Sequence, residues 1–230
     1  FLEKKKNEIF FCKSSTKINE KELLKNEING IKFFINYSKE KITIIENFQN
    51  NYGKIEIKKI DGKIINPNIG FENNIIYIEI VFKKYLDLLK KSNINFSHGD
   101  LSFSNIIFVQ EKCYLIDWEH FSLNNLPKTF DLLYFMFENV FFDHKFKKKI
   151  NQNSLNYIVN KVLYLKEKKL LCKSFYKGDI LSKLVFTLQK EKSIWNYDNF
   201  NLANKFPILQ LNKFLINKID TYINERIQNT

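Results

Sequence analysis

Residues 98–119 read HGDLSFSNIIFVQEKCYLIDWE, and this stretch decides the fold. Two β-prone runs enclose a polar turn, which is the pattern of an antiparallel hairpin. With a three-residue loop, Val109 pairs with Cys113, and the same register brings Asn105 opposite Asp117. Because directly opposed residues lie roughly 4.5 to 5.5 Å apart at Cα, the sequence predicts an amide and a carboxylate side by side at the open end of the hairpin.

These two side chains predict a metal site. Asn105 and Asp117 offer hard oxygen ligands, and magnesium prefers a few such oxygens together with waters and substrate phosphates. Asp100 lies in the loop just before the hairpin, near the same open end. We therefore expect one further carboxylate beside a carboxylate–amide metal site.

The combination of His-Gly-Asp, four residues, Asn and a hairpin into Ile-Asp-Trp-Glu resembles the catalytic core of the aminoglycoside phosphotransferase and choline kinase group. These enzymes are small-molecule relatives of protein kinases, and the resemblance is specific around residues 98–131. It implies an α+β, protein-kinase-like fold with a small β-rich N-lobe and a larger α-helical C-lobe. It also implies that Asp100 is the catalytic aspartate that receives the substrate hydroxyl, while Asn105 and Asp117 are magnesium ligands.

The resemblance gives two more residues a structural role. It implies that His98 braces the loop and that Asp131, at the start of a C-lobe helix, steadies it. Taken singly, these residue types have simpler interpretations: Asn105 alone could be a turn residue, and Asp117 alone a helix cap. The kinase-like interpretation is favoured by their conjunction, with an apolar hairpin between the two halves.

The expected chemistry explains these residue types. In phosphoryl transfer, charge collects on the phosphoryl oxygens of a loose transition state, so the protein mainly aligns the reactants and neutralises charge through metal. An ordinary aspartate, with a pKa of about 3.9, is a weak base towards an alcohol. Asp100 would therefore orient the hydroxyl and take its proton late.

A kinase-like C-lobe also needs a lysine on an N-lobe strand and a glutamate on the helix that follows. Residues 8–13 predict a strand, and residues 20–37 predict a helix with one buried side. Lys13 and Glu27 lie where the family's pair would, in which the lysine grips the nucleotide phosphates and the glutamate fixes the lysine. In a chain rich in lysine, a Glu27 on a solvated helix face is the simpler interpretation, and both stay open.

One element of the family pattern is missing, because no Gly-rich loop precedes Lys13 and the chain begins with Phe1 instead of Met. A fragment that lacks its first strand would explain both facts, so we expect the N-lobe to be truncated. The alternatives are a shortened fold that covers the nucleotide differently, or a degenerate fold that no longer catalyses. This departure bears on nucleotide affinity more than on the identity of the fold.

The composition agrees with one globular unit of two lobes. The chain has 230 residues, of which 44% are hydrophobic and 16% aromatic, enough to bury a substantial core. Turn residues between Gly62 and Gly70 place the lobe boundary, so we predict an N-lobe at residues 1–68 and a C-lobe at residues 69–230. We also predict strands at residues 41–45 and 54–57, and helices at residues 73–91, 155–171, 180–189 and 208–227.

Charge and cysteine usage limit partners and compartment. The net charge of +12 permits a basic nucleic-acid-binding domain as a third interpretation, but the lysines are dispersed and no nucleic-acid-binding motif is present, so we expect no nucleic-acid partner. Cys12, Cys113 and Cys172 are odd in number and widely spaced, as in a reducing compartment. No apolar segment approaches the roughly 20 residues of a membrane span. The expected location is the cytoplasm.

Two departures from protein kinases indicate the class of acceptor. At the position of Gly99, protein kinases usually carry an arginine, which pairs with a phosphorylated activation loop. The segment between Asp117 and Asp131 is also too short for such a loop. We therefore expect an ATP-dependent small-molecule O-phosphotransferase that uses Mg²⁺ and ATP, with GTP not excluded. A sugar, an amino alcohol and an aminoglycoside remain open as acceptors, and residues 126–132 resemble phosphotransferases of bacterial surface-polysaccharide loci. The alternative is a kinase-like nucleotide-binding module that has lost catalysis.

Overall fold

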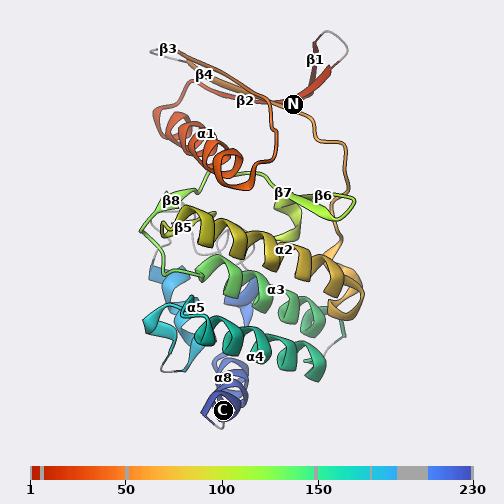
Figure 1. Cartoon of the computed structure of the whole chain (residues 1–230), viewed down its shortest axis with the longest axis vertical. Coiled ribbons are helices and arrows are strands. Elements are labelled where there is room, and N and C mark those ends of the chain that lie inside the picture. Colours follow the sequence, from red (N-terminus) through yellow and green to blue (C-terminus); the bar gives the residue numbers. More distant parts are fainter. Residues whose placement is uncertain are drawn as a thin grey trace. The chain divides into compact units, whose positions relative to one another are not determined.

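The computed structural model has a mixed α+β fold (Figure 1). It describes residues 2–5, 8–49, 52–147, 150–176, 178–190 and 207–228. The contacts divide the chain into two compact units, residues 1–65 with 79–125 and residues 66–78 with 126–230. The chain first passes from one unit to the other after residue 65, close to the expected boundary after residue 68. The hairpin predicted for the C-lobe, however, belongs to the first unit. The division into lobes at residues 1–68 and 69–230 stays a prediction.

The first unit begins with a four-stranded antiparallel sheet. Its strands, in spatial order, are β1 (Leu2–Lys5), β2 (Glu8–Ser15), β4 (Tyr52–Lys58) and β3 (Ile44–Gln49). The strand predicted at residues 8–13 is confirmed as β2, and the one at 54–57 lies within β4. The strand predicted at 41–45 begins only at Ile44, and β1 is an additional strand that the sequence pattern did not reveal.

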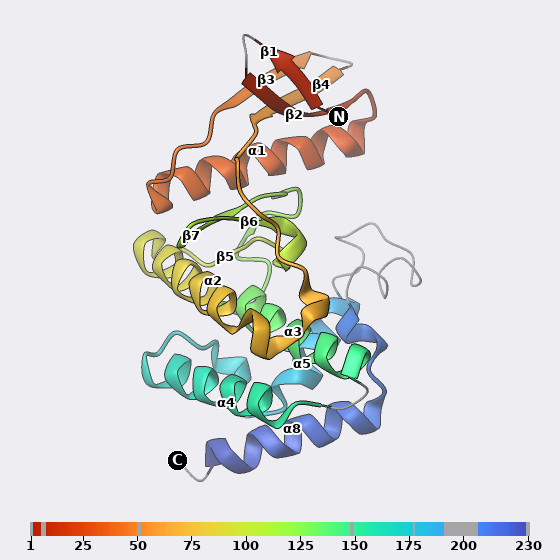
Figure 2. The ribbon, with the colours of Figure 1, turned by 90° about the vertical axis from the view of Figure 1, so that its right-hand side faces the viewer.

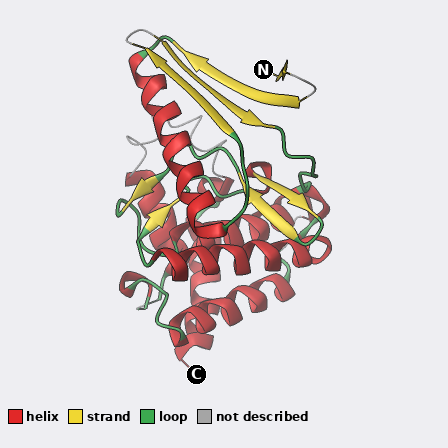
Figure 3. Cartoon of the chain, turned by 45° about the horizontal axis from the view of Figure 1, so that its top comes forward, coloured by secondary structure: helices red, strands yellow, loops and turns green. Residues whose placement is uncertain are grey.

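Helix α1 (Ile18–Ser38) packs on this sheet, and Figure 3 shows it running alongside the strands. Its apolar side contributes Leu24 and Ile28 to a core cluster with Ile55 of β4. Burying a side chain of this size contributes about 1.5–3 kcal/mol, so the amphipathic pattern accounts for the predicted helix. The helix ends where Lys39 takes a left-handed φ of 61° and its N–H donates to Ile35 O at 3.1 Å.

The rest of the first unit consists of short strands and part of a long helix. Helix α2 (Phe71–Ser92) belongs to this unit from Glu79 onwards. Strand β5 (Phe96–Ser97) pairs with β8 (Ser122–Leu123), and β6 (Ile106–Val109) pairs with β7 (Lys112–Leu115).

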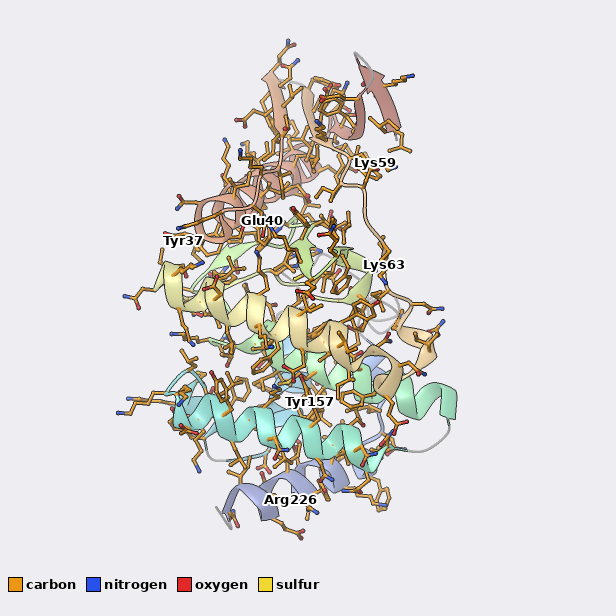
Figure 4. The ribbon with its side chains drawn as sticks, turned by 45° about the vertical axis from the view of Figure 1, so that its right-hand side comes forward. Tyr37, Glu40, Lys59, Lys63, Tyr157 and Arg226 are labelled. Carbon is orange, nitrogen blue, oxygen red and sulfur yellow. The ribbon has the colours of Figure 1, made fainter. Side chains whose placement is uncertain are left out.

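A linker leaves β4 and pairs with the hairpin. Lys59 and Lys63 lie on this linker (Figure 4), and the backbones of Lys63 and Phe108 exchange two hydrogen bonds of 2.9 Å. A Cβ on Gly62 would lie 2.5 Å from Phe108 O, so the linker needs glycine at this close approach. The predicted turn residue therefore also fixes the linker against β6.

The predicted hairpin is present, but the register that we predicted for it is wrong by one residue. Phe108 pairs with Cys113, and Val109 pairs with Lys112, so the loop has two residues instead of three. Gln110 takes a positive φ of 55°, as the first residue of a type II′ turn does. That position usually holds glycine, so glutamine at this position was no local signal for the tighter loop.

The second unit is helical (Figure 2). Besides the first residues of α2, its described helices are α3 (Phe130–Lys147), α4 (Gln152–Glu167), α5 (Ile180–Lys190) and α8 (Lys213–Gln228). The helices predicted at 155–171, 180–189 and 208–227 are confirmed, although the first ends at Glu167 and residues 207–210 form a 3₁₀ turn. Among the described residues, no helix is both long and apolar enough to cross a membrane.

Candidate functional site

Lys13 is the centre of a chain of three charged side chains. In the sheet Lys13 pairs with Ile55, and paired residues point to the same face, which here is the face that α1 covers. Glu27 lies on the same buried side of α1 as the core residue Leu24. Lys13 Nζ donates to Glu27 Oε2 at 2.9 Å and to Asp117 Oδ1 at 2.6 Å. The structure thus brings together three residues that the sequence analysis named for one site.

The two carboxylates that bind Lys13 keep its amino group charged. Burial lowers the pKa of Lys13, but the charges of Glu27 and Asp117 outweigh it and raise the pKa above its ordinary value. Glu27 is only 1% exposed, so the interpretation that it lies on a solvated helix face is wrong. Its burial raises the pKa of Glu27, and the charge of Lys13 opposes this shift. Glu27 Oε1 has no hydrogen-bond partner within the described part of the chain.

Asp117 is presented by a bend at the end of β7. Its φ of 62° is left-handed, which aspartate adopts more readily than most residues. The next residue, Trp118, is fully buried, and its Nε1 donates to Leu115 O at 2.8 Å. Because Trp118 is fixed on one side of the bend, the Asp117 carboxylate is left partly exposed beside Lys13.

His98 links the loop of residues 98–105 to the same bend. Its Nδ1 accepts from the Asp100 N–H at 3.4 Å, so the other nitrogen, Nε2, carries the hydrogen and donates to Ile116 O at 2.9 Å. The ring is fully buried, with its centroid 4.4 Å from that of Trp118. These contacts suit the bracing role that the resemblance implies for His98.

Asp100 and Asn105 hold each other within the loop. Asn105 Nδ2 donates to the backbone oxygen and to Oδ2 of Asp100, both at 2.9 Å. The amide nitrogen is therefore engaged, and Oδ1 is the atom of Asn105 that is suited to a cation. Both residues are buried, at 4% and 7% exposure for Asp100 and Asn105.

A cavity of about 240 Å³ in the first unit is lined by four of the predicted site residues, and Asp100 and His98 are not part of its lining. Its polar lining includes Lys13, Glu27, Asn105 and Asp117. Its apolar lining comes from Phe11, Ile57, Ile60, Ile107 and Ile116, and Lys58 and Ser104 complete it. Two lysines, several oxygen ligands and an apolar wall suit a ligand that has an anionic part and an apolar part.

The donor set fits magnesium. Asn105 and Asp117, which carry hard oxygen ligands, line one cavity, and Glu27, whose buried Oε1 has no hydrogen-bond partner within the described residues, lines the same cavity. Magnesium takes oxygen ligands and keeps waters or phosphates in its remaining positions. The residues that are present could therefore hold this ion.

A second cluster looks like a metal site but has a cation of its own. Ligand atoms of Glu3, Cys12 and Glu56 lie within 4.8 Å of one another. Lys54 Nζ lies 2.8 Å from Glu3 Oε2 and 2.7 Å from Glu56 Oε1. Burial, together with a hydrogen bond to Glu3, raises the pKa of the Cys12 thiol. Lys54 already pairs with both carboxylates, so this cluster is an ionic network.

Sequence reasoning missed Glu119. The His120 side chain, whose Nε2 lies 3.4 Å from Glu119 Oε1, lowers the pKa of this carboxyl group, while burial and the charge of Asp117 oppose the shift and Lys13 adds to it. Glu119 therefore shares the electrostatic environment of the site. The signal was present, because Glu119 ends the Ile-Asp-Trp-Glu motif.

Of the predicted site residues, Asp131 lies in the second unit. It is in the first turn of α3 and is 1% exposed. Its role in steadying the catalytic loop stays a prediction.

Compared with protein-family models and with curated proteins, the chain gives no match.

Proposed function

We propose that this chain is an ATP-dependent small-molecule O-phosphotransferase with a protein-kinase-like two-lobe fold. It transfers the γ-phosphoryl group to a hydroxyl of a sugar, an amino alcohol or an aminoglycoside-like acceptor. The observation that carries the proposal is the bond of Lys13 to both Glu27 and Asp117, the latter across 104 positions of sequence. A lysine that stays charged beside oxygen ligands for a metal is the arrangement that phosphate groups require.

Each group has a part in this reaction. Lys13 binds the phosphate oxygens, and Glu27 orients the lysine from the buried side. Asn105 and Asp117 would hold magnesium, which when bound neutralises and orients the nucleotide phosphates. The apolar lining, with Phe11 and Ile57, accepts the nucleotide base.

Asp100 orients the acceptor hydroxyl. The bond from Asn105 fixes its carboxylate, and the bond of its N–H to His98 fixes its backbone. A carboxylate held in this way aligns the hydroxyl for in-line attack and takes the proton as the new O–P bond forms. Alignment by fixed groups is the main protein contribution in phosphoryl transfer.

The test separates binding from transfer. Binding of a fluorescent ATP analogue is titrated with and without Mg²⁺, and turnover is measured on a panel of hydroxyl compounds. Asp117→Ala is expected to abolish metal-dependent nucleotide binding. Asp100→Ala is expected to keep binding and to lose turnover by about 10²–10⁴-fold. The matched control is Asp61→Ala, because Asp61 is 88% exposed and forms an ion pair of 3.0 Å with Lys59 outside the site.

The outcomes point to different conclusions. Equal turnover of wild type and Asp100→Ala would contradict the catalytic assignment, and unchanged binding by Asp117→Ala would contradict the ligand assignment. Nucleotide binding without any transfer or hydrolysis would favour the inactive binding module. Steeply salt-dependent binding of oligonucleotides, without nucleotide binding, would favour the nucleic-acid interpretation.

A further inference from the structure

Gly30 lies in the interior of α1, where its lack of a side chain has a specific reason. A Cβ at this position would lie 2.4 Å from Trp118 Cβ and 2.8 Å from Trp118 Cγ and Cε3. Glycine inside a helix is about 1 kcal/mol less favourable than alanine. The helix accepts this disadvantage at the point where its backbone touches Trp118.

Trp118 is a rigid surface for this contact. Its side chain is fully buried, and its indole N–H is bonded to Leu115 O. Its ring centroid lies 6.0 Å from that of Phe34, 5.7 Å from that of Phe121 and 4.4 Å from that of His98. A ring enclosed on several sides has no room to move away from α1.

The contact lies next to both carboxylates that bind Lys13. Gly30 is three residues after Glu27, so the two share one side of α1, and Trp118 directly follows Asp117. Lys13 bonds at 2.9 Å to the first carboxylate and at 2.6 Å to the second. N–H···O hydrogen bonds in proteins span about 2.7–3.2 Å between heavy atoms, so a displacement of α1 by the width of a methyl group would break the bond between Lys13 and Glu27.

We propose that Gly30 and Trp118 are positioning residues, whose contact sets the distance of α1 from Asp117 and so keeps Lys13 bonded to both carboxylates. The proposal rests on the proposed function only for the role of Lys13 towards phosphate. The plain alternative is that Gly30 serves core packing and has no effect on Lys13.

The first measurement needs no ligand. Lys13 is acetylated with a limiting dose of acetic anhydride, and its rate is read by mass spectrometry against Lys25, an exposed lysine of α1. Only the uncharged amine reacts, so a lysine paired with two carboxylates reacts slowly. In Gly30→Ala the rate at Lys13 is expected to rise about tenfold, the size expected when one hydrogen bond to a charged group is lost.

The matched control is Gly53→Ala in β4. A Cβ there would lie 2.9 Å from Phe48 Cε1 and 3.3 Å from Lys21 Cγ. These atoms belong to partly exposed side chains that can give way, so the rate at Lys13 is expected to stay at the wild-type value. Trp118→Leu removes the ring from the other side of the contact. If Gly30→Ala does not fold, the acetylation rate at Lys13 in Trp118→Leu tests the positioning role instead. All rates are measured where circular dichroism shows a folded protein.

The second measurement is a double-mutant cycle for nucleotide binding with Gly30→Ala and Lys13→Met. If Gly30 acts through Lys13, Gly30→Ala weakens binding of the fluorescent ATP analogue in wild type and has little further effect in Lys13→Met. An equal loss in both backgrounds, or an unchanged acetylation rate at Lys13, would overturn the positioning role. A wild-type protein that binds no nucleotide would contradict the proposed function, and the acetylation rate would still decide the positioning role.

Discussion

Removing Lys13 is expected to destabilise the protein mainly through the group that it leaves behind. Glu27 has a side-chain exposure of 1%, against 38% for Lys13. Lys13→Met therefore leaves a buried carboxylate without its cation, whereas Glu27→Gln leaves a half-exposed lysine that still pairs with Asp117. The two single variants should have unequal costs, although each breaks the same ion pair.

The magnitudes follow from this asymmetry. Removing one partner of a buried pair costs about 3–5 kcal/mol when the other charge stays buried, and the exposure of Lys13 favours the lower end, about 3 kcal/mol. Glu27→Gln leaves Lys13, which is partly exposed and still paired with Asp117. Loss of its ion pair with Glu27 should therefore cost about 1 kcal/mol or less. The double variant has no orphaned charge, so we expect it to be about 2 kcal/mol more stable than Lys13→Met.

The pH dependence has a definite sign. Burial raises the pKa of Glu27 in the folded protein, and loss of Lys13 removes the main opposing influence. A group whose folded pKa is raised favours the folded state at low pH, and this contribution is lost as the pH rises through the folded pKa. The deficit of Lys13→Met relative to wild type should therefore grow between pH 5 and pH 7.5.

Urea denaturation, followed by circular dichroism, measures all four proteins at both pH values. The reasoning is refuted if Glu27→Gln is destabilised as much as Lys13→Met at pH 7.5. It is also refuted if the double variant is no more stable than Lys13→Met. A deficit that does not change with pH would show that Glu27 is not the orphaned charge.

Three further changes are expected to alter stability. Burial raises the pKa of Cys113 to about 12, so its unfolded thiol ionises first and stability falls between pH 9 and pH 12, by up to about 1.4 kcal/mol per pH unit; urea midpoints of Cys113→Ala should show a smaller fall. Asp220 accepts bonds of 2.8 and 2.9 Å from the N–H groups of Leu181 and Ser182 in α5; Asp220→Ala should cost about 2 kcal/mol, and no change in thermal midpoint would contradict this cap. Gln110→Gly should gain about 0.5 kcal/mol, because relief of its left-handed φ outweighs the added chain entropy; a loss of stability would contradict the strain.

The sequence predicts the helices well because their burial is periodic. In α1 the buried residues Leu24, Ile28 and Ile31 recur with the helical period. Glu27 falls within the same stripe, and its position there was a signal that it is buried and paired. Composition alone favoured a solvated glutamate, because it treats the many lysines of the chain as equivalent.

The hydrophobic pattern of the sequence did not predict strand β1. Its residues, Leu-Glu-Lys-Lys, have one apolar side chain and no alternation. It lies at the edge of the sheet and pairs with β2 through its backbone. Short charged edge strands carry little hydrophobic signal because they bury little.

The contact of Gly30 with Trp118 also has no sequence signal. A glycine within a helix predicts only a weaker helix, and its partner lies far along the chain. The same holds for Lys13 and Asp117, which the resemblance assigned to one site and which no local pattern connects. Contacts of this kind depend on how α1 and the hairpin are packed, which periodicity does not determine.

The error in the hairpin register did not displace the predicted site, and the backbone explains why. In the observed register Asn105 lies opposite Ile116, whose N–H donates to Asn105 O at 3.0 Å. A regular strand would then turn the side chain of Asp117 to the opposite face, because side chains alternate. Strand β7 already ends at Leu115, and the left-handed φ of Asp117 turns the backbone away from the strand direction two residues later, so that Asn105 and Asp117 line the same cavity. The oxygen pair is therefore a consequence of the bend at Asp117, and a substitution that straightened this bend would separate the ligands while leaving the hairpin intact.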